Sequence, residues 1–334
     1  MSRSGGMSRD GRDAREAVIC CTVRNMAGES LEVEMEPDST VLHLKHRVAE
    51  GWQVPPLCQK MALNATLLKD DEPLAPHFAG CSYPSLQISM TIDAEEVYRS
   101  LESEDCAIRR MAVQSLVQFG DKDPERTMHG LAARLEDQDW EVRRAAVEVL
   151  GEVVEAGEEG AISAVLAHLE DRSVSVRQAS VTTLAQLAPK GDDRIISAIG
   201  ALLEDRDDGV RRAAGHALAE VAPKGDVRSV AAASARLEHW SALVKRAAVE
   251  ALACVANLGD ERVLAGVSAC LRQEPGLLRQ AAVTALAQLV PKGSPPSSIT
   301  ALLTSCLEDC DERVRQAAVN ALQQVGQQGK PAPA

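Results

Sequence analysis

Few residues in this chain have the types and spacings that perform chemistry. Cys306 and Cys310 lie four residues apart, but no second pair of cysteines at similar spacing follows to complete a metal site. His216 has Arg212 and Glu220 at helical spacing, which is typical of a solvated helix surface. The sequence lacks a Gly-rich phosphate loop, a Gly-x-Ser-x-Gly elbow and a Cys-x-x-Cys pair. We therefore predict no catalytic residue, no metal site and no cofactor.

A sequence repeat predicts the structural elements that would position any functional residue. A leucine recurs every 34 residues, with a last interval of 36, at Leu101, Leu135, Leu169, Leu203, Leu237, Leu271 and Leu307. Eight residues after each leucine stands a cation: Arg109, Arg143, Arg177, Arg211, Lys245, Arg279 or Arg315. Seven copies in register predict stacked units, each of which buries its apolar side against its neighbours.

Each repeat is predicted to be two helices joined by a short turn. In the fourth repeat we expect a first helix over Asp192–Leu203, capped by Asp192 or Asp193, and a turn over Glu204–Gly209. The second helix is expected over Val210–Val221. It should end at Ala222-Pro223-Lys224-Gly225, because proline cannot continue a helix and glycine accepts the left-handed conformation. The insertion over 294–298 explains the longer last interval.

The second helices have one apolar and one polar face. Positions 7, 11, 15 and 18 after the leucine are mostly apolar and fall within about 80° of arc, so they predict a core stripe. Positions 9, 13 and 17 lie nearly opposite and should face solvent on the concave side of the stack. An ordinary solvated surface would show the same pattern. Read instead as a binding groove, the stripe predicts these partner-binding residues: Arg110, Arg144, Glu148, Gln178, Arg212, His216, Arg246, Glu250, Gln280 and Gln316.

Residues 93–325 resemble HEAT repeats, especially the short, regular kind found in phycobilin lyases. The stretches that carry the resemblance are Leu203-Glu204-Asp205, Val210-Arg211-Arg212-Ala213-Ala214 and Ala217-Leu218. It implies a mostly α fold, a right-handed α-solenoid of about seven helical hairpins. It also implies that the turn aspartate and the second-helix arginine form a structural ladder between repeats. Asp137, Asp171, Asp205 and Asp309 match that aspartate, whereas Ser103, His239 and Gln273 depart from it and predict a weaker ladder there.

Residues 17–92 do not repeat and read as a small α+β domain. Strands are expected over Ile19–Val23, Leu31–Met35, Gln59–Leu63, Leu67–Leu68 and Ser85–Met90. One helix should follow the capping cluster Asp38-Ser39-Thr40, with Val41, Leu44 and Val48 on its apolar face.

This layout resembles the ubiquitin-like β-grasp fold, with Glu36-Pro37, Val54-Pro55-Pro56 and Gln59-Lys60 on matching positions. The positions that match the apolar receptor patch of ubiquitin are Met26, Ala62 and Ser89, so the patch is largely lost. No free C-terminal Gly-Gly follows, because Thr91-Ile92-Asp93 leads into the repeats. We expect a fixed, non-conjugated module that serves either as a docking domain or as a cap for the first repeat.

Composition narrows the function further. The net charge of −13 disfavours a grip on phosphate backbones, so we predict protein partners and no nucleic acid. Nine irregularly spaced cysteines without a signal peptide predict free thiols and an intracellular, cytoplasmic location with no membrane span. The tails, 1–16 and 326–334, are expected to be disordered. Trp140 and Trp240, in the turns, are expected to be half-buried by packing.

We accordingly predict a non-catalytic scaffold or adaptor that binds a partner through the second-helix face. No histidine is followed by glutamate, which argues against the iron chemistry of HEAT-repeat hydroxylases. Two alternatives stay open. One is a bilin lyase-like protein that holds a tetrapyrrole, and the other is a regulatory subunit of a ubiquitin-pathway complex. The sequence does not indicate the oligomeric state.

Overall fold

The structure is a computed structural model that describes residues 18–326, except 37, 79–84, 121, 274 and 292–295. The chain forms two compact units, 1–130 and 131–334. The tails predicted to be disordered lie outside the described residues, apart from Gly326, which ends the last helix. The predicted boundaries at 17–92 and 93–325 remain predictions.

The N-terminal part of the first unit holds a five-stranded sheet in the order β2-β1-β5-β3-β4. Its strands are β1 (Ile19–Arg24), β2 (Ser30–Met35), β3 (Gln59–Leu63), β4 (Thr66–Leu67) and β5 (Leu86–Ile92). β1 pairs antiparallel with β2 and parallel with β5, and β5 pairs antiparallel with β3. The predicted strands are therefore present to within a residue or two.

One helix, α1 (Val41–Trp52), packs on this sheet. It begins after Thr40, whose side chain accepts a hydrogen bond from the backbone N–H of His43. Alternate residues of β1 and β2 turn inward to meet the apolar face of α1. The buried core contains Cys21, Val23, Val33, Met35, Val41, Leu44, Val48, Met61, Leu86 and Ile88. The short helices η1 (Pro56–Cys58) and α2 (Ala75–Phe78) complete this part.

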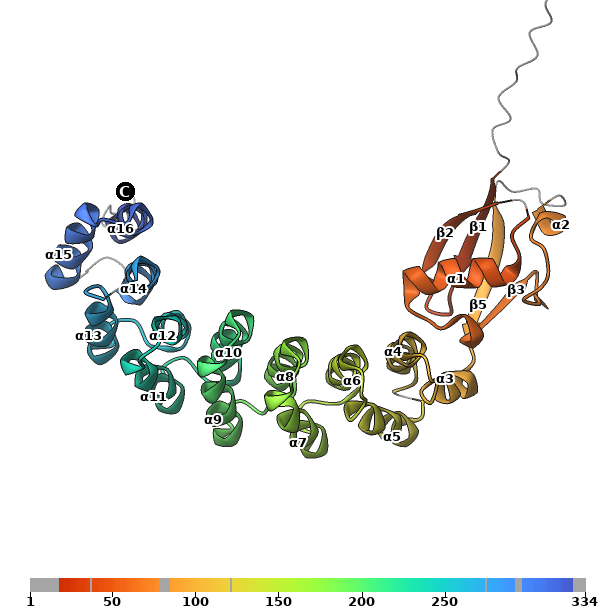
Figure 1. The fold of residues 1–334 in the computed structure, drawn as a ribbon, viewed down its shortest axis with the longest axis horizontal. Coiled ribbons are helices and arrows are strands. Elements are labelled where there is room, and N and C mark those ends of the chain that lie inside the picture. Colours follow the sequence, from red (N-terminus) through yellow and green to blue (C-terminus); the bar gives the residue numbers. More distant parts are fainter. Residues whose placement is uncertain are drawn as a thin grey trace, which may run out of the picture. The chain divides into compact units, whose positions relative to one another are not determined.

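Seven helical hairpins follow in sequence within the described residues (Figure 1). They are α3 (Ala94–Ser100) with α4 (Cys106–Ser115), α5 (Pro124–Leu135) with α6 (Trp140–Val153), α7 (Glu159–Ala167) with α8 (Val174–Leu187), α9 (Asp193–Ala201) with α10 (Asp208–Val221), α11 (Val227–Ala235) with α12 (Ala242–Val255), α13 (Glu261–Cys270) with α14 (Gly276–Leu289), and α15 (Ser297–Ser305) with α16 (Glu312–Gly326). Short 3₁₀ turns such as η4 (Leu202–Glu204) end several first helices.

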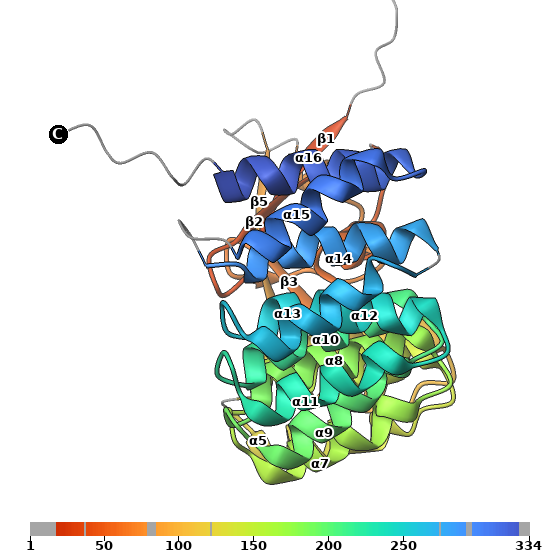
Figure 2. The ribbon, with the colours of Figure 1, turned by 90° about the vertical axis from the view of Figure 1, so that its left-hand side faces the viewer.

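In the second unit these hairpins stack side by side (Figure 2). The second helices α6, α8, α10, α12, α14 and α16 pack successively against one another. They form the inner layer of the curved stack, and the first helices form the outer layer (Figure 1). The predicted α-solenoid is confirmed. No helix in the described part of the chain has the length and apolar character needed to cross a bilayer.

The core stripe of the second helices is buried as predicted. In α10, Val210, Ala214 and Leu218 are fully buried and Val221 is almost so. Alanines at the equivalent of Ala214, such as Ala248 and Ala282, are also fully buried. Side chains this small let neighbouring helices approach closely, which suits a core with almost no aromatic residues.

The predicted turn of the fourth repeat is too long. Asp208 and Gly209, assigned to the turn over Glu204–Gly209, are instead the first residues of α10. The cause is Asp207, whose carboxylate accepts hydrogen bonds from the backbone N–H groups of Gly209 and Val210 and so starts the helix earlier. At the first helix the expectation holds, because Asp192 caps α9.

Candidate functional site

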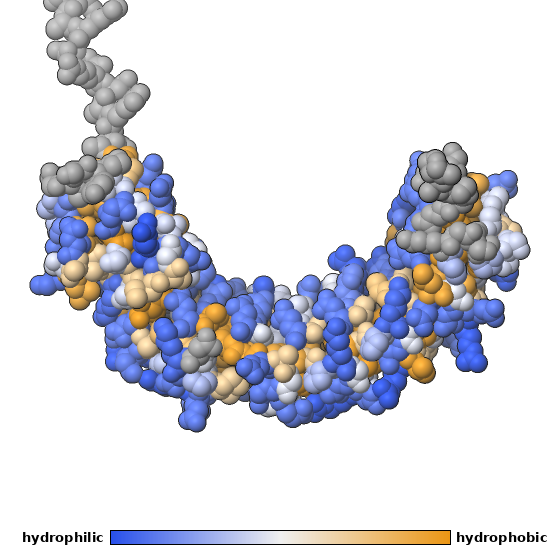
Figure 3. Space-filling view, turned by 180° about the vertical axis from the view of Figure 1, so that it is seen from behind, coloured by the Kyte–Doolittle hydropathy of each residue, from blue (hydrophilic) through white to orange (hydrophobic). Residues whose placement is uncertain are grey.

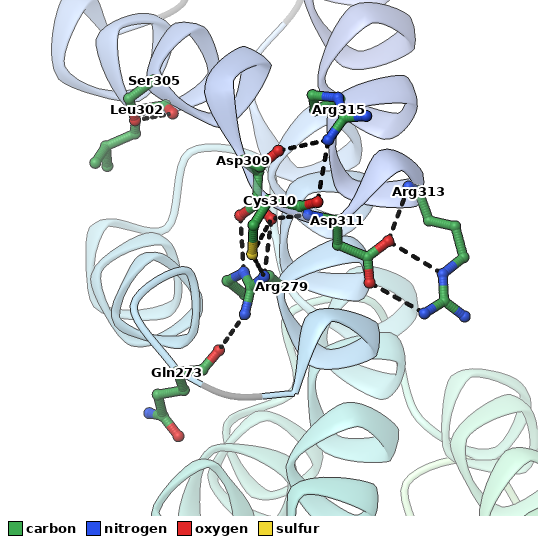
Figure 4. A network of polar contacts seen from close by, with 9 residues as sticks. All are labelled: Gln273, Arg279, Leu302, Ser305, Asp309, Cys310, Asp311, Arg313 and Arg315. Atoms are coloured by element: carbon green, nitrogen blue, oxygen red, sulfur yellow. Dashed lines mark hydrogen bonds and ion pairs between the residues drawn. The ribbon is translucent and has the colours of Figure 1, made fainter.

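Arginines of the second helices link consecutive repeats of the second unit at the turns. Arg143 donates through Nε and Nη2 to both carboxylate oxygens of Asp171, at 2.8 and 2.9 Å. Arg177 binds Asp205 in the same bidentate manner. Arg279 does so with Asp309 (Figure 4). The Nη1 group of each arginine also donates to a carbonyl of its own turn. The arginine column is therefore structural, as predicted.

These contacts also set the ionisation of the turn aspartates. Burial opposes ionisation of Asp171 and Asp205 and is the largest single effect on each. Hydrogen bonds from Arg143 or Arg177 and from a backbone N–H of the turn, together with the nearby positive charge, outweigh it, so that the pKa of both carboxyls is lowered. Hydrogen bonding by Arg279 lowers the pKa of Asp309 to about 2.

The ladder is interrupted at the junctions where the sequence departs from the pattern. At position 239 the Nδ1 atom of histidine accepts from the backbone N–H of Ser241 at 3.0 Å, as an aspartate would, but histidine offers Arg211 no carboxylate from the next repeat. Arg211 turns to Asp208 of its own helix instead, at 2.7 Å. At the next junction Lys245 donates to the neutral side chain of Gln273 at 2.6 Å. The predicted weakening at His239 and Gln273 is confirmed.

A second ladder, which the sequence did not reveal, joins the repeats at their other end. The backbone N–H of the glycine that follows a second helix donates to a carbonyl near the end of the next second helix, at 2.7–2.8 Å. The pairs are Gly157 with Leu187, Gly191 with Val221, Gly225 with Val255, and Gly259 with Leu289. Gly225 has φ +80°, so the left-handed glycine predicted for the fourth repeat is present, and its N–H is used between repeats.

The predicted binding stripe faces solvent. Arg144, Gln178, Arg212, His216 and Gln316 are exposed, and Glu148, Arg246, Glu250 and Gln280 are half-buried. Arg110 belongs to the first unit, where its guanidinium donates to the side chain of Gln53 at 3.2 Å. The assignment of these residues to partner binding remains a prediction.

Three open pockets lie along the second helices. The first, about 420 Å³, lies on α10, α12 and α14 and brings together Arg212, His216, Arg246, Glu250 and Gln280. The second, about 400 Å³, brings together Arg144, Glu148 and Gln178 on α6 and α8. A third, of about 300 Å³, holds Gln280 and Gln316 on α14 and α16. The polar stripe thus lines a row of open hollows on the second helices.

The pocket on α10, α12 and α14 is the most highly charged of the three. Asp208 is contacted by three guanidinium groups, from Arg211, Arg212 and Arg246. Burial opposes its ionisation, but hydrogen bonding by Arg246 and Arg211 lowers its pKa overall. Burial raises the pKa of Glu250, which lies 3.8 Å from the Nε atom of Arg246. Sequence reasoning missed Asp208, because it was placed in a turn.

Among the described residues, no group of three or more His, Cys, Asp or Glu side chains lies close enough to hold a metal ion. The cysteines of the described residues, Cys306 and Cys310 included, are free thiols. Burial raises the pKa of the Cys254 thiol in the first pocket, so this group stays protonated and is a poor nucleophile.

On the face that Figure 3 presents, polar side chains predominate, with small separate apolar areas between them. The prediction that both turn tryptophans are half-buried is wrong for Trp240, which is 91% exposed and stacks only loosely on His239. Trp140 begins α6 and is 40% exposed. In the N-terminal sheet part, Met26 is 82% exposed, whereas Ala62 is half-buried and small.

Comparison with protein families agrees with this architecture. The family model for HEAT repeats matches residues 95–185, 129–219, 163–253 and 230–323. The chain belongs to the HEAT-repeat family. The ubiquitin family model matches residues 21–77 of this HEAT-repeat protein, so its N-terminal domain is ubiquitin-like.

Among solved structures, a crystal structure of importin beta resembles the chain with a TM-score of 0.56 and 14% sequence identity. The match covers 72% of this chain and 36% of the importin beta chain, and at this identity it shows the fold alone. A search of the curated proteins found no match.

Proposed function

We propose that this HEAT-repeat protein is a non-catalytic scaffold that holds a segment of a partner protein along its second helices. The observation that supports this most is the row of three open pockets, each lined by the polar stripe of α6 to α16. A row of open hollows suits an extended or helical polypeptide, which spreads its contacts along a groove. The arginines and glutamines of the stripe supply hydrogen-bond donors for such a segment.

Photo-crosslinking tests the face that is used. Benzoylphenylalanine is placed at Gln178 or Gln280 in the groove, and at the exposed positions Ser197 or Ala265 on the outer helices as matched controls. We expect a defined protein to crosslink from the groove positions and not from the outer ones. Equal labelling from both sets would refute the proposal. Co-purification of a coloured bilin would instead support the tetrapyrrole alternative.

We also propose that the ubiquitin-like domain caps the first repeat. Within the first unit, the backbone N–H of Asp93 donates to the carbonyl of Cys58 at 2.8 Å, and Lys60 pairs with Asp93 at 3.5 Å. The Cys58 thiol lies 3.5 Å from the Ser100 hydroxyl, and both residues are buried. These contacts join η1 and β3 to α3 and the residue before it. The hydrogen bond from Arg110 to Gln53 adds a link between α4 and the end of α1.

Removal of residues 1–92 tests the cap. If the domain shields the apolar end of the stack, hydrogen exchange in α4 should become faster in the shortened chain while α10 is unaffected. Unchanged protection in α4, with loss of a crosslinked partner, would instead identify the domain as a docking module.

A further inference from the structure

We infer that the pocket on α10, α12 and α14 receives an acidic side chain of the partner segment, with Arg212 and Arg246 as the contacting cations. This inference rests on the proposed function, because it names the chemistry of the segment that the groove holds. The partner it describes is a polypeptide stretch rich in Asp or Glu.

An excess of positive charge supports it. Around this pocket, within the described part of the chain, the ion pairs join three guanidinium groups to two carboxylates, those of Asp208 and Glu250. His216 adds a further basic group at the rim. The excess is local, since the chain as a whole carries a net charge of −13. A non-specific attraction to acidic partners is therefore not expected, and binding would depend on this one place.

The two arginines differ in how they can meet a ligand. Arg212 is 62% exposed, and among the described residues its guanidinium makes one ion pair, at 3.7 Å with Asp208. Arg246 is half-buried, because Asp208 holds its Nη2 group and its buried Nε–H lies 3.8 Å from Glu250 without a hydrogen bond. A carboxylate at the mouth of the pocket would accept charge-assisted hydrogen bonds from Arg212 and would be attracted by the positive charge of Arg246.

Small buried residues lie between the polar side chains of the pocket. They are Gly215, Ala247 and Ala251, and a Cβ atom built on Gly215 would lie 3.4 Å from that of Ala251, because α10 and α12 pack closely here. Gln280 and Thr284, on the neighbouring helix, offer neutral polar groups to the main chain of the bound segment.

The pocket on α6 and α8 gives an internal comparison. There Arg144 is held by Glu148 at 2.7 Å, and Glu152 adds a second carboxylate. That pocket has no surplus of positive charge, although its arginine occupies the equivalent position of the repeat. The preference for an acidic residue is thus specific to the C-terminal half of the groove.

Fluorescence anisotropy with synthetic peptides tests the inference. Three peptides of equal length carry Glu, Gln or Lys at alternate positions between Gly and Ser. We expect the full chain to bind the Glu peptide at least about tenfold more tightly than the other two, with affinity falling as salt rises from about 50 to 200 mM.

Variants locate the effect. Arg212→Ala and the double variant with Arg246→Ala should remove the preference for the Glu peptide, while Arg194→Ala on the outer helix α9, an arginine paired with Glu159, should leave it intact. If the double variant unfolds the junction between α10 and α12, the single variant Arg212→Ala still tests the preference. Equal binding of all three peptides, no binding of the Glu peptide at about 1 mM, or an unaffected Arg212→Ala variant would overturn the inference.

The two proposals fail in different ways. A groove crosslink to a neutral or basic segment would overturn the acidic preference and leave the groove as an interface. The lack of any crosslink specific to the groove would overturn the proposed function itself.

Discussion

Replacing His239 with aspartate is expected to stabilise the junction between the fourth and fifth repeats. Where an aspartate occupies this position, as in Asp171, it accepts one backbone N–H of its own turn and two N–H groups of the preceding arginine. His239 keeps only the first role. The substitution His239→Asp preserves that acceptor and brings a negative charge towards Arg211.

The size of the effect follows from the surroundings of Arg211. Its side chain is 4% exposed, and its Nε–H has no hydrogen-bond partner among the described residues. Hydrogen bonds to a charged group contribute about 1.5–3 kcal/mol. Part of this is lost because the new carboxylate must be desolvated and Asp208 already binds the same guanidinium. We therefore expect a net gain of about 1–2 kcal/mol, or about 2–8 °C in melting temperature for a unit of this length.

Thermal and urea denaturation at neutral pH would measure the gain, with His239→Asn as the matched control. Asparagine offers the same acceptor to Ser241 without the charge, so this variant should match the wild type. The gain should also disappear as the pH falls below about 4, because the new carboxyl, whose pKa the ion pair lowers, then becomes protonated. If the aspartate variant is no more stable than the asparagine variant, the ladder does not work through charge pairing and our reading of it is wrong.

Three further predictions follow from the same contacts. Arg177→Ala leaves the buried carboxylate of Asp205 without its guanidinium and should lower the free energy of unfolding, measured by urea titration, by about 3–5 kcal/mol. Arg172→Ala changes an exposed neighbour and serves as the control. An equal loss of stability in both variants would contradict the prediction. The pKa of Asp309 is about 2 in the folded chain and 3.8 as a free side chain. The ionised carboxylate of Asp309 therefore stabilises the fold fully above about pH 4, and this stabilisation is lost as the pH falls towards 2. Asp309→Asn should therefore show a smaller drop in melting temperature over that range, and an unchanged drop would count against the assignment. Glu250→Gln should tighten binding of the Glu peptide about two- to tenfold at neutral pH, as measured by anisotropy, and unchanged affinity would show that this carboxylate does not oppose the ligand.

Much of the repeat architecture could be predicted because its signals are local and periodic. The recurring leucines and the apolar face of α10, from Val210 to Val221, depend only on the pitch of a helix. The exposure of the polar stripe follows from the same geometry. The weak points of the arginine ladder were predictable as well, because histidine or glutamine at positions 239 and 273 cannot provide a carboxylate.

Two features could not be predicted, one because several carboxylates compete for the same role and the other because the bonded residues lie far apart in the sequence. The segment Asp205–Asp208 offers three carboxylates for one ladder and one cap, and only the folded turn shows that Asp207 caps the helix. This choice frees Asp208 for the groove, where it meets Arg246 from the following helix. The glycine ladder was hidden for a similar reason, since each bond joins residues about 30 positions apart.

The two ladders hold opposite ends of each second helix, and they are unequal. From Gly157 to Gly259 the backbone bonds continue without interruption, whereas the side-chain bonds at the turns lose their charge pairs at His239 and Gln273. At these two junctions the glycine bonds hold one end of the second helices, whereas at the turns the ladder carboxylate is missing and α10 and α12 are joined instead by the Asp208–Arg246 charge pair. If a bulky partner widens the groove, we therefore expect the change on the turn side of α12 and α14, with the Asp208–Arg246 pair broken before any glycine bond is lost.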